Sequence, residues 1–338
     1  MNNLKNEQSK SNTNDPTLSN TYLFGQNSVN ANKTLINNLI NDNLLVTNEN
    51  NNNNVNNNKN KINIDKKEKN YENNLILEIM TSWNLPVGYN LTIKNRHGLE
   101  NSLIKRSLKE KEDRNIVYFG FQREEELNTN PDIDYLLYPK EDFYDSKFIG
   151  KHFQIRYDEN EKLYYIKDLG FGFGTFIKLT KEIKLKDNFL INIGETYIVF
   201  SIKSNNNDNN DNNDNNDITD INENDNNSIN IKVFSGDENC DNYIFDHFSN
   251  PKILIGRKTS CDIVIEDKML SRVHCSVFFI NSENIEDRGW FLKDGNLNGK
   301  KSTNDTWFYS AEETLIEDKM VFKTNHNLFK CIIQEEQE

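Results

Sequence analysis

Short apolar runs separated by turn residues fill two stretches of the chain, residues 75–203 and residues 229–335. Runs of this length and texture, with no long helical period after Arg114, are typical of strands in an all-β sandwich or barrel. The first stretch predicts strands at residues 89–94, 116–121, 135–138, 152–157, 163–168, 175–179, 188–193 and 196–202. The second predicts strands at residues 229–234, 243–245, 252–255, 262–265, 274–280, 290–293, 306–309, 319–323 and 328–334.

Asparagine-rich stretches surround these strand-like regions. Residues 48–60 hold ten Asn among thirteen positions, and residues 205–217 contain only Asn and Asp. Such stretches have almost nothing to bury, so they cannot offset the entropy lost on ordering. We therefore expect a disordered tail over residues 1–74, a sandwich over 75–203, a disordered Asn/Asp-rich linker over 204–228 and a second sandwich over 229–335. A flexible linker predicts two sandwiches that move independently.

The two halves of the chain are similar to each other. Residues 148–155 line up with residues 270–277, and residues 171–176 line up with residues 302–307. Two matches in the same order indicate an internal duplication.

The formal net charge is −13, and residues 231–338 alone hold 13 Lys and Arg against 19 Asp and Glu. This balance argues against direct nucleic-acid binding, which usually shows a basic domain or patch. A phosphate site would have to be a local basic spot, which six residues could make: Arg257, Lys258, Lys268, Arg272, Lys300 and Lys301.

The four cysteines form no C-x-x-C pair and no zinc-like spacing with histidine, so we expect no metal and no cofactor. No apolar stretch is long enough to span a bilayer, and no signal pattern opens the chain. We expect an intracellular protein, cytoplasmic or nuclear, that has no membrane partner.

Three polar clusters follow strand-like runs near the C-terminus: Gly256-Arg257, residues 271–274 and residues 302–306. Arginine offers a planar fork for an oxyanion, Ser and Thr offer hydroxyl donors, and Asn can bind a peptide backbone. No nucleophile or acid–base pair accompanies them. The clusters therefore predict a receptor for a phosphate group on an extended peptide, with no catalytic residues.

These clusters resemble the signature of the forkhead-associated (FHA) domain over residues 229–335. That family is a β-sandwich whose apical loops bind phosphothreonine peptides. The resemblance implies that Arg257 and Ser271 hold the phosphate, with Arg272 and Thr303 beside it, and that Asn304 binds the peptide backbone. It implies structural roles for Gly256 and His274. Met269 lies where the family reads the third residue after the phosphothreonine, which suggests an apolar preference.

Two departures from the family pattern bear on binding. Asp305 replaces the glycine that usually follows Asn; it tolerates positive φ, but its carboxylate would repel a phosphate unless it points outward. Residues 75–203 resemble the same fold with the site blank, because Phe121, Ile149 and Phe173 stand at the Arg, Ser and Asn positions. We expect that half not to bind phosphothreonine.

The sequence therefore predicts a non-catalytic adaptor that captures phosphothreonine proteins through its C-terminal FHA domain, in an unknown oligomeric state. The alternative is a scaffold that docks partners through surfaces unrelated to phosphate. An enzyme is not expected. The glycine-rich residues 170–175 suggest a nucleotide loop, but they precede a strand, and no kinase or P-loop motif accompanies them.

Overall fold

The computed structural model describes residues 73–82, 85–95, 97–104, 109–111, 113–129, 131–137, 149–203, 228–235, 240–284 and 286–335. Nearly all the regular structure in this part of the chain is strand. The predicted disorder of the tail and of the linker concerns residues that, apart from the ends of the two segments, lie outside the described ranges.

The first half of the chain supplies one short helix and eleven strands among the described residues. They are β1 (Asn73–Thr81), β2 (Asn90–Lys94), β3 (Gly98–Leu99), β4 (Ile116–Phe121), α2 (Glu124–Thr129), β5 (Tyr135–Leu136), β6 (Gly150–Asp158), β7 (Leu163–Asp168), β8 (Thr175–Lys178), β9 (Ile183–Lys184), β10 (Phe189–Ile193) and β11 (Thr196–Lys203).

The second half repeats the pattern. Its strands are β12 (Ser228–Phe234), β13 (Cys240–Asp246), β14 (Lys252–Gly256), β15 (Ile263–Val264), β16 (Cys275–Ile280), β17 (Gly289–Asp294), β18 (Trp307–Tyr309), β19 (Thr314–Leu315), β20 (Val321–Thr324) and β21 (Asn327–Glu335). Each predicted run overlaps one of these strands. The strands not predicted are β1, β3, β9 and β19. Strands β3, β9 and β19 have two residues each, which is too short to show alternation.

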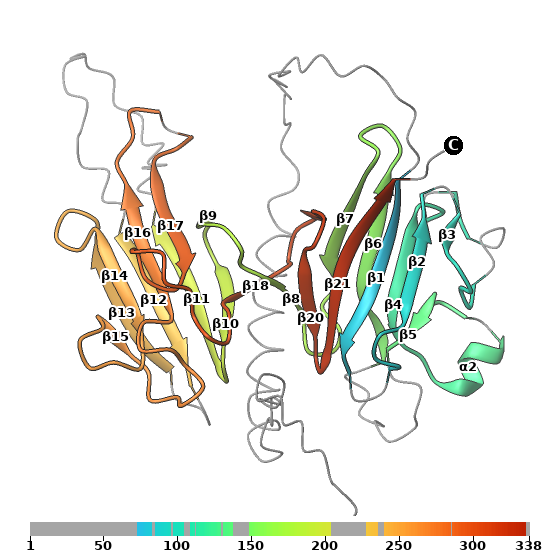
Figure 1. Cartoon of the computed structure of the whole chain (residues 1–338), viewed down its shortest axis with the longest axis horizontal. Coiled ribbons are helices and arrows are strands. Elements are labelled where there is room, and N and C mark those ends of the chain that lie inside the picture. The colour runs from blue at the N-terminus through green and yellow to red at the C-terminus, as the bar shows by residue number, and fades with distance from the viewer. Residues whose placement is uncertain are drawn as a thin grey trace, which may run out of the picture.

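The strands form one eleven-stranded sheet and two five-stranded sheets (Figure 1). The long sheet has the order β13-β12-β11-β10-β18-β8-β20-β21-β1-β2-β3. One of its ends packs on the sheet β15-β14-β16-β17-β9, and the other packs on the sheet β19-β7-β6-β4-β5. The molecule is therefore two β-sandwiches that share a continuous sheet.

Each sandwich is completed by strands from the other half of the chain, which differs from the expectation that residues 75–203 and 229–335 each close their own. Strands β19, β20 and β21 join the sandwich of β1–β8, and β9, β10 and β11 join that of β12–β18. In Figure 1 the red β20 and β21 accordingly lie beside the blue β1. Strand β1 pairs with β21 over its whole length, from Asn73↔Glu335 to Thr81↔Leu328.

The exchanged strands contribute core residues, so the exchange is not a surface contact. Phe322 and Phe329 are fully buried in the first sandwich, where their rings lie 5.4 and 6.4 Å from that of Phe153. The second core likewise takes six residues from the first half: Leu179, Leu185, Ile191, Ile193, Ile198 and Phe200. Burying a large apolar side chain contributes about 1.5–3 kcal/mol, so neither core is complete without the other half.

The chain crosses between sandwiches at two four-residue connections, residues 179–182 and 310–313. There β8 and β18 pair antiparallel, with Phe308 opposite Ile177. The same hydrogen bonds recur on both sides: Leu179 N–H donates to the Thr306 carbonyl, and Ser310 N–H donates to the Thr175 carbonyl. The crossing is thus pseudo-symmetric, as expected for two copies of one fold.

The exchange also changes what the Asn/Asp-rich segment has to span. Strands β11 and β12 are antiparallel neighbours, and Lys203 lies opposite Ser228 in their register. The segment between them therefore leaves and re-enters the fold at adjacent strand ends. The sequence predicts that this segment separates two independently moving sandwiches. In the structure it does not do so.

A buried polar contact also joins the halves at the crossing. The Tyr309 hydroxyl donates to the Asp168 carboxylate over 2.6 Å. Asp168 is 2 % exposed, and burial raises its pKa to about 6. The carboxylate is therefore held in a position where its charged form is disfavoured.

Cleavage of the segment between β11 and β12 tests the strand exchange. A protease site placed within residues 205–217 should yield, after cutting, two fragments that elute as one particle and separate only in denaturant. Both sandwiches contain strands from both fragments, so neither fragment can leave without opening two cores. Size-exclusion chromatography with light scattering measures this, with the uncut protein as control. Two separate peaks in native buffer would contradict the exchange.

The buried Asp168 predicts a pH-dependent stability term. A folded-state pKa near 6, above the ordinary value near 4, means that the folded protein retains a proton that the unfolded chain releases. The contribution of protonated Asp168 to the free energy of unfolding is therefore fully present below about pH 4. It is lost as the pH rises through about 6. Urea unfolding should show Asp168→Asn gaining stability relative to the wild type over this window. A difference that does not change with pH would contradict the assignment.

Candidate functional site

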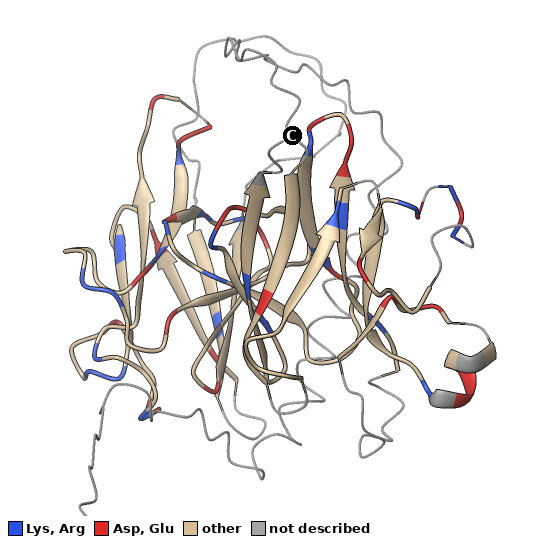
Figure 2. Ribbon diagram, turned by 45° about the vertical axis from the view of Figure 1, so that its right-hand side comes forward, with Lys and Arg blue, Asp and Glu red and all other residues tan. Residues whose placement is uncertain are grey.

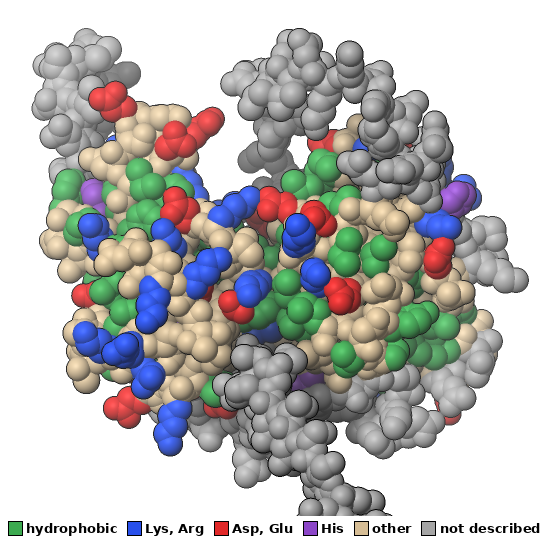
Figure 3. Space-filling model, in the orientation of Figure 1, with side chains coloured by type: hydrophobic (Ala, Val, Ile, Leu, Met, Phe, Trp, Pro, Cys, Tyr) green, Lys and Arg blue, Asp and Glu red, His purple; other side chains and the backbone are tan. Residues whose placement is uncertain are grey.

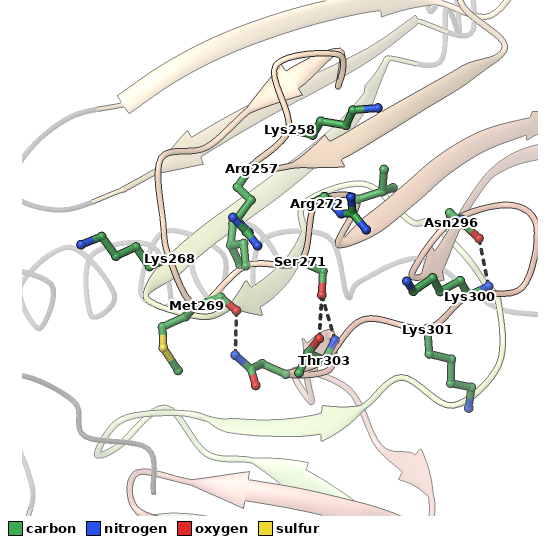
Figure 4. Close-up of a pocket in the computed structure, with 13 residues that line it drawn as sticks. Arg257, Lys258, Lys268, Met269, Ser271, Arg272, Asn296, Lys300, Lys301 and Thr303 are labelled. Carbon is green, nitrogen blue, oxygen red and sulfur yellow. Dashed lines mark hydrogen bonds between the residues drawn. The ribbon is translucent and has the colours of Figure 1, made fainter. Parts of the chain in front are cut away.

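Three loops at one end of the second sandwich surround a pocket: the β14–β15 loop (residues 257–262), the β15–β16 loop (residues 265–274) and the β17–β18 loop (residues 295–306). Figure 4 shows the pocket with its lining side chains. Its lining residues are Arg257, Lys258, Lys268, Met269, Leu270, Ser271, Arg272, Val273, Asn296, Lys300, Lys301, Thr303 and Asn304. The structure thus brings all five predicted phosphopeptide-binding residues, and Met269, to one pocket.

His274 joins two of these loops through hydrogen bonds. Its side chain is fully buried; Nδ1 accepts a hydrogen bond from the Ser271 N–H (3.1 Å), and Nε2 donates to the Asp305 carbonyl (3.0 Å). Burial lowers the pKa of His274, which favours the neutral ring that this pattern requires. His274 therefore links the β15–β16 loop to the β17–β18 loop.

Gly256 lets the first loop pass close to the second. A Cβ on Gly256 would lie 2.6 Å from the Arg272 carbonyl oxygen and 2.9 Å from the His274 nitrogen. The Arg257 N–H donates to the Ser271 carbonyl, and the Lys258 N–H donates to the Arg272 carbonyl. Because Gly256 has no side chain, the two loops approach closely enough to form these hydrogen bonds. The bonds hold Arg257 beside Ser271.

Ser271, Thr303 and Asn304 form a small network across the pocket. The Ser271 Oγ accepts from the Thr303 N–H (2.9 Å) and donates to the Thr303 Oγ1 (3.3 Å). The Asn304 amide donates to the Met269 carbonyl over 2.6 Å. These bonds place two hydroxyls together and hold Asn304 across from the β15–β16 loop.

The β17–β18 loop is closed on itself by a buried carboxylate and a tight turn. Asp294 accepts from the Ser302 hydroxyl (2.6 Å) and the Thr306 hydroxyl (2.8 Å). Asn296 Oδ1 accepts from the Lys300 N–H (2.9 Å), so a turn presents Lys300 and Lys301 at the pocket edge. Asn296 is a pocket residue that the sequence analysis did not name. An Asn three residues before Gly299 is typical of a turn, and this was the available signal.

Asp305 adopts the left-handed conformation that the usual glycine would supply, with φ of 58°. Its carboxylate forms an ion pair with Lys178 of β8 over 2.8 Å, and Asp305 is not among the pocket-lining residues. Lys178 belongs to the first half of the chain, so no comparison of the FHA motif alone would have found this partner. The repulsion expected from Asp305 is thus reduced by a cation and by orientation.

The exchanged β10–β11 hairpin supports the loop that carries Ser271. The Asp267 carboxylate accepts from the Glu195 N–H (3.1 Å) and from the Met269 N–H (2.7 Å). A Cβ on Gly194 would lie 2.5 Å from the same carboxylate. The pocket therefore depends on residues from the first half of the chain that touch the loop from behind.

Positive charge gathers on this end of an acidic protein. Figure 2 shows Lys and Arg on the loops around the pocket, and Figure 3 shows their side chains clustered over the lower part of the second sandwich. All six basic lining residues are exposed, and none makes an ion pair with a described residue. No carboxylate lines the pocket. The six cations can therefore contact an anionic ligand without breaking an ion pair to a described residue.

The first half has the same backbone arrangement without the charges. A Cβ on Gly120 would lie 2.1 Å from the Gly150 carbonyl oxygen and 3.1 Å from the His152 nitrogen, matching the surroundings of Gly256. The Phe171 ring lies against Gly150, 2.8 Å from where its Cβ would be, and is 47 % exposed. Phe121, Ile149 and Phe173 supply no donor for an oxyanion.

Among the described residues no group of three or more His, Cys, Asp or Glu is placed to hold a metal, and no helix is both long and apolar enough to cross a bilayer. Cys261, Cys275 and Cys331 are buried, Cys240 is exposed, and all four are free thiols. The glycine-rich residues 170–174 precede β8, a strand, and not a helix.

Comparison with known proteins agrees with this architecture. Residues 129–194 and 253–322 both match the family model of the FHA domain, which is consistent with tandem FHA domains. No curated protein matches. A solved structure that is similar is that of the Slr1951 protein from Synechocystis sp., at 16% identity over 28% of this chain and 90% of that chain. The TM-score of that match is 0.17.

Replacing His274 tests how the loops are held. His274→Ala removes hydrogen bonds to both Ser271 and Asp305 and leaves a cavity in a fully buried position. We expect a loss of about 2–4 kcal/mol in the free energy of unfolding. Urea denaturation measures it, with the exposed Thr259→Ala as control. A loss no larger than that of the control would show that His274 does not organise the loops.

Proposed function

We propose that the protein is a non-catalytic, intracellular adaptor whose C-terminal FHA domain binds phosphothreonine peptides. FHA domains are known as phosphothreonine-binding modules of signalling and adaptor proteins. The observation that supports this function most directly is the convergence of Arg257, Ser271, Arg272, Thr303 and Asn304 on one pocket without a carboxylate. The compartment is proposed to be the cytoplasm or the nucleus.

The roles proposed for these residues follow from their chemistry. Arg257 and Arg272 provide guanidinium groups for the phosphate, and charge-assisted hydrogen bonds of this kind are worth about 1.5–3 kcal/mol each. Ser271 and Thr303 provide the hydroxyls beside them. Asn304 binds the peptide backbone, and Met269, which is 39 % exposed, offers an apolar contact to a residue after the phosphothreonine.

The first half is proposed not to bind phosphate. Its equivalent loop ends carry Phe121, Ile149 and Phe173. These side chains would remove water from a phosphate dianion without donating a hydrogen bond to it. Its exposed Phe171 favours the second candidate function, a docking surface that acts without phosphate. The two functions are compatible because they use different sandwiches of the molecule.

Peptide titrations with the full chain test the main proposal. A degenerate phosphothreonine library should yield a ligand that loses at least about 30-fold in affinity when unphosphorylated, because about 2 kcal/mol of charge-assisted bonding is lost. Arg257→Ala should cause a similar loss while the unfolding curve is unchanged. Lys252→Ala, an exposed change on β14 outside the pocket, is the matched control.

The opposite outcome is equally definite. Equal affinity for phosphorylated and unphosphorylated peptides, or no ligand in the library, would reject the phosphothreonine function. Capture of partners that survives both phosphatase treatment and Arg257→Ala would favour phosphate-independent docking. Residues 229–335 alone are not a valid test, since they lack β10 and β11.

A further inference from the structure

The pocket carries more positive charge than one phosphothreonine requires. A phosphate monoester bears about −1.5 to −2 charges at neutral pH, which Arg257 and Arg272 balance. Four lysines remain on the same lining: Lys258, Lys268, Lys300 and Lys301. Six of the 13 basic residues in residues 231–338 thus lie on one pocket, within a region that has 19 acidic residues.

This concentration of charge is unusual for the molecule. Elsewhere several basic side chains form ion pairs, as in Arg156–Glu313 (2.7 Å), Lys178–Asp305 (2.8 Å) and Lys181–Glu317 (2.6 Å). None of the six cations of the pocket has such a partner among the described residues. Like charges held together repel one another, and a bound anion relieves that repulsion.

The extra lysines are also held by defined backbone contacts. Lys258 follows Arg257 and its N–H is bound to the Arg272 carbonyl. The turn before Lys301 is fixed on both sides, because the Asn296 N–H donates to the Lys300 carbonyl and the Lys300 N–H donates back to Asn296 Oδ1, both over 2.9 Å. The backbone at these positions is therefore ordered before a ligand arrives, so binding has to order only the lysine side chains.

The lysines lie on two sides of Ser271. In Figure 4, Lys258, Lys300 and Lys301 lie with Arg272 on one side, while Lys268 lies with Met269 on the other. Met269 is the residue proposed to contact a side chain after the phosphothreonine. The side with three lysines then faces the residues before it.

We propose that the ligand of this pocket is a multiply phosphorylated peptide, with a second phosphate on a residue amino-terminal to the phosphothreonine and bound by Lys258, Lys300 and Lys301. This inference rests on the proposed phosphothreonine function. A long polyanion does not fit the same evidence, because the cations are confined to three loops of a chain with a net charge of −13. A short peptide with clustered phosphates needs only this local field.

Fluorescence polarisation with the full chain and four versions of one peptide tests the inference. The versions carry the phosphothreonine alone, the phosphothreonine with phosphoserine two or three residues before it, the same phosphoserine after it, and glutamate in place of the preceding phosphoserine. We expect the preceding phosphoserine to tighten binding at least about 10-fold, since two or more charge-assisted contacts are added. The other two versions should gain less than about 3-fold.

Variants locate the second phosphate. Lys300→Ala with Lys301→Ala should remove most of the gain while leaving the affinity for the singly phosphorylated peptide within about 3-fold, as expected for exposed charges at the pocket edge. Lys268→Ala removes a charge from the other side of the same pocket and is the matched control. It should leave the ratio between doubly and singly phosphorylated peptides unchanged.

Three outcomes would overturn the inference: no gain from the second phosphate, an equal gain from glutamate, or a gain that survives the Lys300/Lys301 double variant. Each of these leaves the phosphothreonine function intact if the singly phosphorylated peptide still binds and requires Arg257. Loss of binding to the singly phosphorylated peptide in the wild type is a separate result, and it rejects the proposed function itself.

Discussion

The antiparallel pairing of β8 with β18 is the constraint on which the rest of the structure depends. These short strands lie at the centre of the eleven-stranded sheet, and each is followed by a four-residue connection that leads into the opposite sandwich. Once the strands pair there, β9–β11 and β19–β21 can only complete the partner core. The two sandwiches consequently form one folding unit and are expected to unfold together.

The pocket shows how one backbone can carry or lack a binding function. In both copies a glycine approaches the chain just before a buried histidine, at Gly120 and His152 in the first and at Gly256 and His274 in the second. These contacts are steric and hydrogen-bonding, and they are independent of the side chains that face solvent. Charge at the loop ends distinguishes the copies, so the scaffold persists where the proposed anion site is absent.

The strands and the residues of the pocket could be predicted from local sequence, because both depend on short-range information. Alternation from residue 116 to 121 predicts β4, and the spacing of Arg257, Ser271 and Asn304 follows from loops at one end of a sandwich. The strand exchange was not predictable in this way. Residues 314–335 have an apolar pattern that fits either core, and a duplicated sequence contains no local signal that chooses between them. The Lys178–Asp305 contact depends on that exchange, so it was equally hidden.

The register that places Lys203 beside Ser228 has a consequence for how this gene product can vary. A segment whose two anchors are neighbours only has to close a loop, and doubling the length of such a loop costs only about 0.6 kcal/mol. Expansion or contraction of the Asn/Asp repeat should therefore alter neither sandwich. Low-complexity tracts of different lengths could accumulate at this position without selection against misfolding.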